Sequence, residues 1–257
     1  MLENITKVGV SGDWHGNLGW VLPVLKNFKN NGIQHIIQVG DFGFIWGGQD
    51  TATGLRKLIR DLDRNDQYVY VVPGNHEDYA RINDTPENPD GTKFYRSKRI
   101  ILLPRGYRGM IGDKTFVVLG GANSIDFEGR TEWISWWRDE SITLGDVYRT
   151  VSGGKADIMF THDAPAGITM PYDGTDNGWS AKAIRYSNEG RETLRQAVDA
   201  VKPEIIFHGH HHLYQDVKVA LNDGSDEYIV RSVGLARDTM PAANVIFDSE
   251  LNDYELI

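Results

Sequence analysis

Four of the eight histidines in this chain fall within residues 208–212, in the stretch FHGHHHLY. Neutral imidazole is the most common protein ligand for metal ions. The apolar run EIIF precedes the cluster and is typical of a buried strand that ends in a polar loop. The chain has no cysteine, so a metal would be held by imidazole, carboxylate, amide or water ligands. The cluster therefore favours a metal site if further ligands end neighbouring strands.

Residues of ligand type also follow other apolar runs. They are Asp13 and His15 in GDWHG, Asp41 in VGDFG, Asn75 and His76 in PGNHED, His162 in THDAP, and His210 and His212 in HGHHH. In extended backbone, the i, i+2 spacing of the Asp13 and His210 pairs would turn both side chains of each pair to one side. A single aspartate at a strand end is more often a turn former. The whole set, in this order, favours a metal centre.

The elements that must position these residues follow an α/β pattern. Strands are predicted in KVGVS, HIIQV, YVYVV, TFVVL, DIMFT, EIIF and YIVRSVG, and AANVIFD with DYELI could form a closing hairpin. Helices are predicted over residues 18–32, 51–66 and 188–203, with Pro23 marking a start or a kink in the first. In open α/β sheets, ligands gather at the carboxyl ends of strands, where all the candidate ligands fall.

Composition limits the classes of function. The chain has 257 residues and shows no repeat or linker, so we expect one domain over residues 1–257, with turn-rich loops at residues 83–92 and 170–180. The net charge of −9 opposes sequence-blind nucleic-acid binding. No signal peptide, membrane-length apolar run or cysteine is present, so we expect a cytoplasmic protein without a membrane partner. The basic stretch at residues 93–109 is either a solvated face or a rim that attracts an anionic substrate.

Together the motifs resemble the signature of calcineurin-like metallophosphoesterases, which reads D-x-H, G-D, G-N-H-[DE], H and G-H-x-H. Here DWH, GD, GNHE, His162 and GHHH supply every element, over roughly residues 7 to 213. The resemblance implies an α/β fold, a four-layer α-β-β-α sandwich of two mixed β-sheets flanked by helices. It places a dimetal site at the C-terminal ends of the strands and makes His211 the variable position of the last motif.

The resemblance also implies roles for the residues. The first metal would be held by Asp13, His15, Asp41 and His212, and the second by Asp41, Asn75, His162 and His210, with Asp41 bridging. These ligands suit two divalent ions, with manganese as our first choice and iron, zinc, nickel or cobalt as alternatives. A hydroxide activated by the ions would attack phosphorus, and His76 would protonate the leaving oxygen.

The implied activity is that of a phosphoesterase acting on phosphodiesters, with nucleic acids or nucleotides only as substrates, or on phosphomonoesters. The second motif, GDFGFIWGG, lacks the second Asp and the Arg of the protein-phosphatase branch, whose motif is G-D-x-x-D-R-G. This departure favours diesters or small molecules, and it leaves the partner of His76 open. Glu77 and Asp78 could orient it or could be exposed turn acids. The alternative functions are a non-catalytic scaffold on the same fold and a two-metal amide hydrolase.

Substrate contacts are predicted for Asn75, Asn123 and Arg130. Asn123 and Arg130 follow the strand predicted in TFVVL, at the same edge of the sheet as the ligands. Arg130 could clamp a substrate phosphate, or it could be an ion-paired surface residue.

Other aromatic residues have less specific patterns. Trp133, Trp136 and Trp137 have the spacing of one helix face, which predicts core packing, with a base-stacking or lid surface as the alternative. His208 alternates along the strand with His210, so we expect it to support the ligands from behind.

Overall fold

The computed structural model describes residues 2–170 and 178–257 and contains two mixed β-sheets. Most of the loop predicted at residues 170–180 lies outside the described residues. In spatial order, the first sheet contains β13 (Asp253–Leu256), β12 (Asn244–Asp248), β1 (Lys7–Ser11), β2 (His35–Gln38), β3 (Tyr68–Val71), β5 (Ile100–Leu102) and β4 (Lys93–Phe94). The second contains β10 (Gln215–Asn222), β11 (Glu227–Gly234), β9 (Ile205–His208), β8 (Ile158–Thr161), β7 (Lys114–Leu119) and β6 (Arg108–Ile111).

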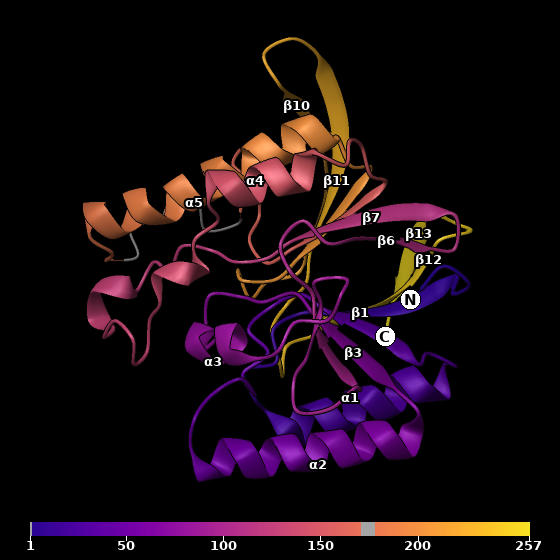
Figure 1. Ribbon diagram of the computed structural model, residues 1–257. Helices are drawn as coiled ribbons and strands as arrows, with labels where there is room; N and C mark the ends of the chain where they lie inside the picture. The colour runs from indigo at the N-terminus through magenta and orange to yellow at the C-terminus, as the bar shows by residue number, and fades with distance from the viewer. Residues whose placement is uncertain (1, 171–177) are drawn as a thin grey trace.

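The helices lie outside the two sheets (Figure 1). They are α1 (Leu18–Asn30), α2 (Gln49–Asn65), α3 (Tyr79–Asp84), α4 (Leu144–Val151) and α5 (Ala181–Val201), with short 3₁₀ turns η1 (Phe127–Gly129) and η2 (Arg138–Glu140). Helices α1 and α2 cover one sheet, and α4 and α5 cover the other. The predicted α-β-β-α sandwich is therefore confirmed.

Three apolar layers hold the sandwich together. Val10 and Phe207 belong to the layer between the two sheets. Phe28 and Leu58 pack α1 and α2 on the first sheet, and Leu194 packs α5 on the second. Strands buried on both faces need near-continuous apolar sequence, which explains the runs seen in the sequence.

Parallel pairing brings the ligand-bearing loops together. Strands β1, β2, β3 and β5 are parallel in the first sheet, and β7, β8, β9 and β11 are parallel in the second. The carboxyl ends of parallel strands meet at one edge of a sheet. Every loop that carries a candidate ligand follows one of these strands, so the topology gathers the ligands in one place.

The predicted helices and the closing hairpin are present, with shifted ends. Helix α1 begins after Asn17, whose side chain accepts a hydrogen bond from the Trp20 backbone, and Pro23 lies inside it rather than at its start. Helix α5 begins at Ala181, earlier than predicted, because Ser180 caps it. Strands β12 and β13 form the closing antiparallel pair. No helix in the described ranges has the length and apolar character needed to cross a membrane.

The helix predicted from the tryptophan spacing is wrong. Residues 131–137 form a turn in which the Trp133 backbone N–H donates to the Trp136 carbonyl at 2.8 Å, and Trp133 has a φ of 67°. Trp137 is buried and stacks edge-on to Trp46, whereas Trp133 is 65% exposed. The three tryptophans therefore do not share one buried face, because they lie in a turn instead of a helix.

Two basic side chains of residues 93–109, Arg99 and Arg105, make structural contacts. Arg99 pairs with Asp63 and Asp66 of the α2 end. Arg105 donates to four backbone carbonyls and to Asp146. These contacts favour the structural interpretation over a rim that attracts substrate.

Candidate metal centre

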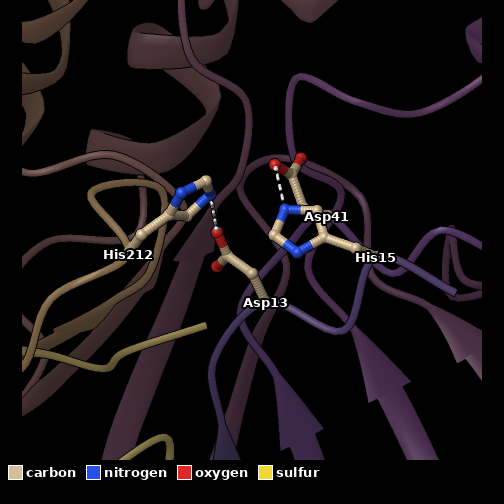
Figure 2. A group of neighbouring side chains, drawn as sticks. All are labelled: Asp13, His15, Asp41 and His212. Carbon is tan, nitrogen blue, oxygen red and sulfur yellow. Dashed lines mark ion pairs between the residues drawn. The ribbon is translucent and has the colours of Figure 1, made fainter. Parts of the chain in front are cut away.

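The first predicted ligand set converges in the structure. One donor atom from each of Asp13, His15, Asp41 and His212 lies within 4.8 Å of the others. Nε2 of His15 lies 3.6 Å from Oδ2 of Asp41, and Nε2 of His212 lies 3.3 Å from Oδ2 of Asp13 (Figure 2). The four side chains come from the loops after β1, β2 and β9, and both carboxylates are buried.

The second predicted set meets around the amide oxygen of Asn75. This Oδ1 atom lies 2.9 Å from Nε2 of His162 and 3.0 Å from Nδ1 of His210. Nε2 of His162 is also 3.3 Å from Oδ1 of Asp41. The two carboxylate oxygens of Asp41 therefore face different sets, Oδ2 toward His15 and Oδ1 toward His162, which is the arrangement that a bridging ligand needs.

The backbone that presents these residues is not extended, so the expected alternation along a strand is wrong. His15, Asp41, His210 and His212 all have positive φ, between 45° and 65°. Aspartate and histidine are enriched in this left-handed region among residues other than glycine, but each such residue costs roughly 1–3 kcal/mol. The turns are held by backbone bonds, among them those from the Trp14 and His15 N–H groups to the Asp41 carbonyl. Turns, rather than pleating, bring the side chains together.

Close approach of two loops explains the glycine before Asp41. Gly40 has a φ of 106°, and a Cβ atom there would lie 2.1 Å from Nδ1 of His162. This nitrogen lies 2.7 Å from the Val39 carbonyl. If it donates there, Nε2 of His162 is left to act as a ligand. A side chain at position 40 would displace the imidazole from that position.

The electrostatics of the cluster call for positive charge. Burial opposes protonation of His15, but the hydrogen bond and charge of Asp41 outweigh it and raise its pKa to about 9. Burial also opposes protonation of His162, and the charge of Asp41 raises its pKa to about 10. Protons on these imidazoles thus offset the buried carboxylates. The donor set of buried carboxylates, imidazoles and one amide fits two divalent cations, which would supply that charge instead.

The motifs find their match in a known family. A sequence model of calcineurin-like phosphoesterases matches residues 6–214. The chain belongs to the calcineurin-like phosphoesterase family. Members of this family generally use two divalent metals, and the clustered Asp and His side chains agree with such a site.

Solved structures share the fold of this chain. A protein of Thermus thermophilus, TT1561, is 11% identical with a TM-score of 0.53, and the alignment covers 98% of this chain and 97% of that one. A dimetal phosphatase from Danio rerio is 12% identical with a TM-score of 0.54, over 94% and 92% of the two chains. No curated protein was matched in sequence. At these identities the likeness shows the fold alone.

One residue that supports the candidate metal centre was missed by sequence reasoning. Oδ1 of Asp238 lies 3.0 Å from Nδ1 of His15, and its Oδ2 accepts a hydrogen bond from Asn17 at 2.7 Å. A carboxylate on the far nitrogen of a ligating histidine fixes the ring orientation. Asp238 follows β11, beyond the matched family region, and its place in a polar loop after a strand was the available signal.

The histidines between the ligands have structural partners. Nε2 of His211 lies 2.9 Å from Oδ1 of Asp163, and both side chains are largely buried. His208 lies 3.1 Å from Ser232 and faces the ring of His211 rather than a predicted ligand. His208 therefore contacts His211 and Ser232 in place of the predicted ligands.

The acidic neighbours of His76 do not orient its ring. Glu77 is buried, not an exposed turn acid, and accepts a hydrogen bond from the Phe42 backbone at 2.7 Å. Burial, with the charge of Asp41, raises the pKa of Glu77 to about 8. Asp78 caps α3 and pairs with Arg81. Glu77 thus holds the loop that follows Asp41.

Arg130 contacts the ring of His76. Its Nη2 lies 2.8 Å from Nδ1 of His76 and also contacts Nε2, while its Nε and Nη2 donate to Asp126. The Arg130 side chain is only 10% exposed, which argues against a surface role. Asn123, in contrast, donates to the Tyr186 backbone and packs against α5. Its substrate role stays a prediction, without a contact that favours it.

We expect Asp238→Asn to weaken Mn²⁺ binding by about 10- to 100-fold, the usual effect of removing a carboxylate behind a ligating histidine. Calorimetric titration of metal-stripped protein measures this effect. Asp113→Asn, in the exposed turn between β6 and β7, is the matched control and should bind as wild type does. Unchanged binding by Asp238→Asn would mean that His15 holds its orientation without this carboxylate.

Metal-free protein should lose stability as the pH rises from about 6.5 to about 10. The pKa values of His15 and His162, about 9 and about 10, exceed the ordinary histidine value of about 6.5. The stabilisation is complete below the ordinary value and is lost as the pH passes the folded-state values. Urea unfolding in chelator near pH 6.5 and near pH 9.5 measures it, and a His15→Gln, His162→Gln protein should show a smaller fall. An equal fall in both proteins would refute the charge assignment.

Proposed function

We propose that this calcineurin-like phosphoesterase is a two-metal enzyme that hydrolyses phosphodiesters or small phosphomonoesters, with manganese as the preferred metal. The observation that carries the proposal is the position of Asp41, whose two oxygens face two converging ligand sets. Iron, zinc, nickel or cobalt would also suit these ligands. When bound, the two ions would lower the pKa of a water nucleophile and offset negative charge on the phosphoryl oxygens.

The chain itself would supply the proton and the anion contact. An arginine N–H can only donate, so the contact from Arg130 requires a lone pair on His76. Burial lowers the pKa of His76, and the charge of Arg130 adds to this. A substrate phosphate would give Arg130 a stronger acceptor. The freed nitrogen of His76 could then take up a proton from solvent and donate it to the leaving oxygen.

The second motif supports a substrate other than a phosphoprotein. Phe44 and Ile45 stand where the protein-phosphatase motif has Asp and Arg, and both are buried in the core. Arg130 approaches His76 from a different loop. Nucleotides and nucleic acids are included as substrates because the exposed indole of Trp133, three residues beyond Arg130, could stack on a base.

Metal-dependent turnover tests the proposal directly. Metal-stripped protein is reloaded separately with Mn²⁺, Zn²⁺, Ni²⁺ or Mg²⁺ and assayed with bis-p-nitrophenyl phosphate and p-nitrophenyl phosphate. We expect turnover with Mn²⁺, higher with the diester, and none in Asp41→Asn. Protein that binds two ions and hydrolyses neither ester with any metal would contradict the proposal and favour the scaffold alternative.

His76→Ala should keep its metals and lose activity by about 10²- to 10⁴-fold, the usual contribution of a general acid. The loss should be smallest for esters with good leaving groups, because these need no proton. Turnover of p-nitrophenyl and alkyl esters, with metal content measured on the same samples, separates the two roles. A His76→Ala protein that has lost its metals would show that His76 is a ligand.

Arg130→Ala should raise KM roughly 10- to 100-fold, the value of a lost charge-assisted hydrogen bond. Arg138→Ala is the matched control, because Arg138 is nearby in sequence, exposed, and paired with Glu132 instead. Steady-state kinetics with the diester gives KM and kcat separately. An unchanged KM in Arg130→Ala would remove this residue from the substrate contacts.

A further inference from the structure

A buried chain of hydrogen bonds runs behind the predicted ligand Asn75. Its Nδ2 donates to Oγ of Ser124 at 2.8 Å, and Oγ of Ser124 donates to Oε2 of Glu140 at 2.6 Å. The three side chains are 3%, 0% and 0% exposed. Neither Ser124 nor Glu140 belongs to the motif set, and the chain links a metal-ligand loop to the segment that ends at η2.

Within the part of the chain that the structure describes, the hydrogen bonds to the Glu140 carboxylate come from neutral donors. Its carboxylate also accepts the Ser124 backbone N–H at 2.7 Å, Nε1 of Trp136 at 2.8 Å and the Tyr186 hydroxyl at 3.2 Å. Backbone and indole N–H groups can only donate, so the cage requires an acceptor at Glu140. A buried carboxylate is costly, and four hydrogen bonds compensate for it without neutralising its charge.

The direction of these bonds fixes the orientation of the Asn75 amide. A serine hydroxyl has one proton, and Ser124 gives it to Glu140. Only a lone pair is then left toward Asn75, so the amide must present its NH₂ group to Ser124. Its oxygen must therefore face His162 and His210, the side on which the second ion would lie. With the hydroxyl proton free, the amide could turn and offer NH₂ to the ion.

We propose that Glu140 is a positioning residue that acts through Ser124 to hold the Asn75 oxygen toward the second metal. This inference rests on the proposed function for the identity of the two ion sites. It concerns metal affinity at one site, so it can be tested without turnover.

The test is calorimetric titration of metal-stripped, full-length protein with Mn²⁺. Ser124→Ala removes the link between Glu140 and Asn75 but leaves the other three donors in place. Tyr186→Phe is the matched control, because it removes one donor from Glu140 and leaves the link intact. His162→Gln and His15→Gln identify which binding event belongs to which ligand set. The titrations are run at pH 8, because burial raises the pKa of Glu140 to about 7 and the carboxylate is the form that accepts.

His162→Gln should abolish Mn²⁺ binding at the second site. We expect Ser124→Ala and Glu140→Gln to weaken Mn²⁺ binding at that same site by about 10- to 100-fold. In these two variants, Mn²⁺ affinity at the first site, which His15→Gln disrupts, should be unchanged. The Tyr186→Phe protein should bind both ions as wild type does. If Glu140→Gln does not fold, Ser124→Ala decides alone. Wild-type affinity at both sites in Ser124→Ala would overturn the proposal, as would an equal loss in Tyr186→Phe, which would indicate general loosening.

The two proposals fail in different ways. Wild-type protein that binds two Mn²⁺ ions without turnover would contradict the proposed function and leave the positioning role to be decided by the titrations. Wild-type protein that binds fewer than two ions would overturn both.

Discussion

The candidate site depends on one buried carboxylate, whose negative charge must be offset by positive charge nearby. Asp41 is 1% exposed, and its two oxygens face imidazoles that come from loops of both sheets. Removing a carboxylate from water is expensive unless positive charge is brought to it. The negative charge of Asp41 raises the pKa values of His15 and His162, so both rings hold a proton more tightly in metal-free protein. Two divalent cations would bring more positive charge to the carboxylate than these protons do. The buried charge of Asp41 thus explains why the donor set suits divalent cations.

The sandwich supplies the rigidity that such a site needs. The strands that precede the ligand-bearing loops come from both sheets, and the apolar layer between the sheets packs against them. This packing allows the loops to keep several non-glycine residues in left-handed backbone, which short peptides would avoid. Strain at the ligands is therefore offset by burial in the layers beneath them.

The layered fold and the convergent ligands could be predicted from sequence, because apolar runs mark buried strands and ligand motifs mark their ends. The supporting contacts could not. Asp238 lies 223 positions from His15, and Arg130 lies 54 positions from His76, so neither pairing has a local signal. The spacing of the three tryptophans predicted a helix, but these residues lie in a turn that is closed by backbone hydrogen bonds. A local sequence pattern can fit two conformations equally well. Contacts between residues far apart in the chain select one of them, and the pattern does not contain those contacts.

The most direct test of the two-metal centre is anomalous diffraction from crystals grown with Mn²⁺, recorded at an energy where manganese scatters strongly. We expect two peaks about 3.5–4 Å apart, the spacing of two-metal hydrolases, with one oxygen of Asp41 toward each. One peak should contact Asp13 and His212, and the other should contact Asn75 and His162. A single peak, or two peaks that do not share Asp41, would contradict the bridging role of this carboxylate.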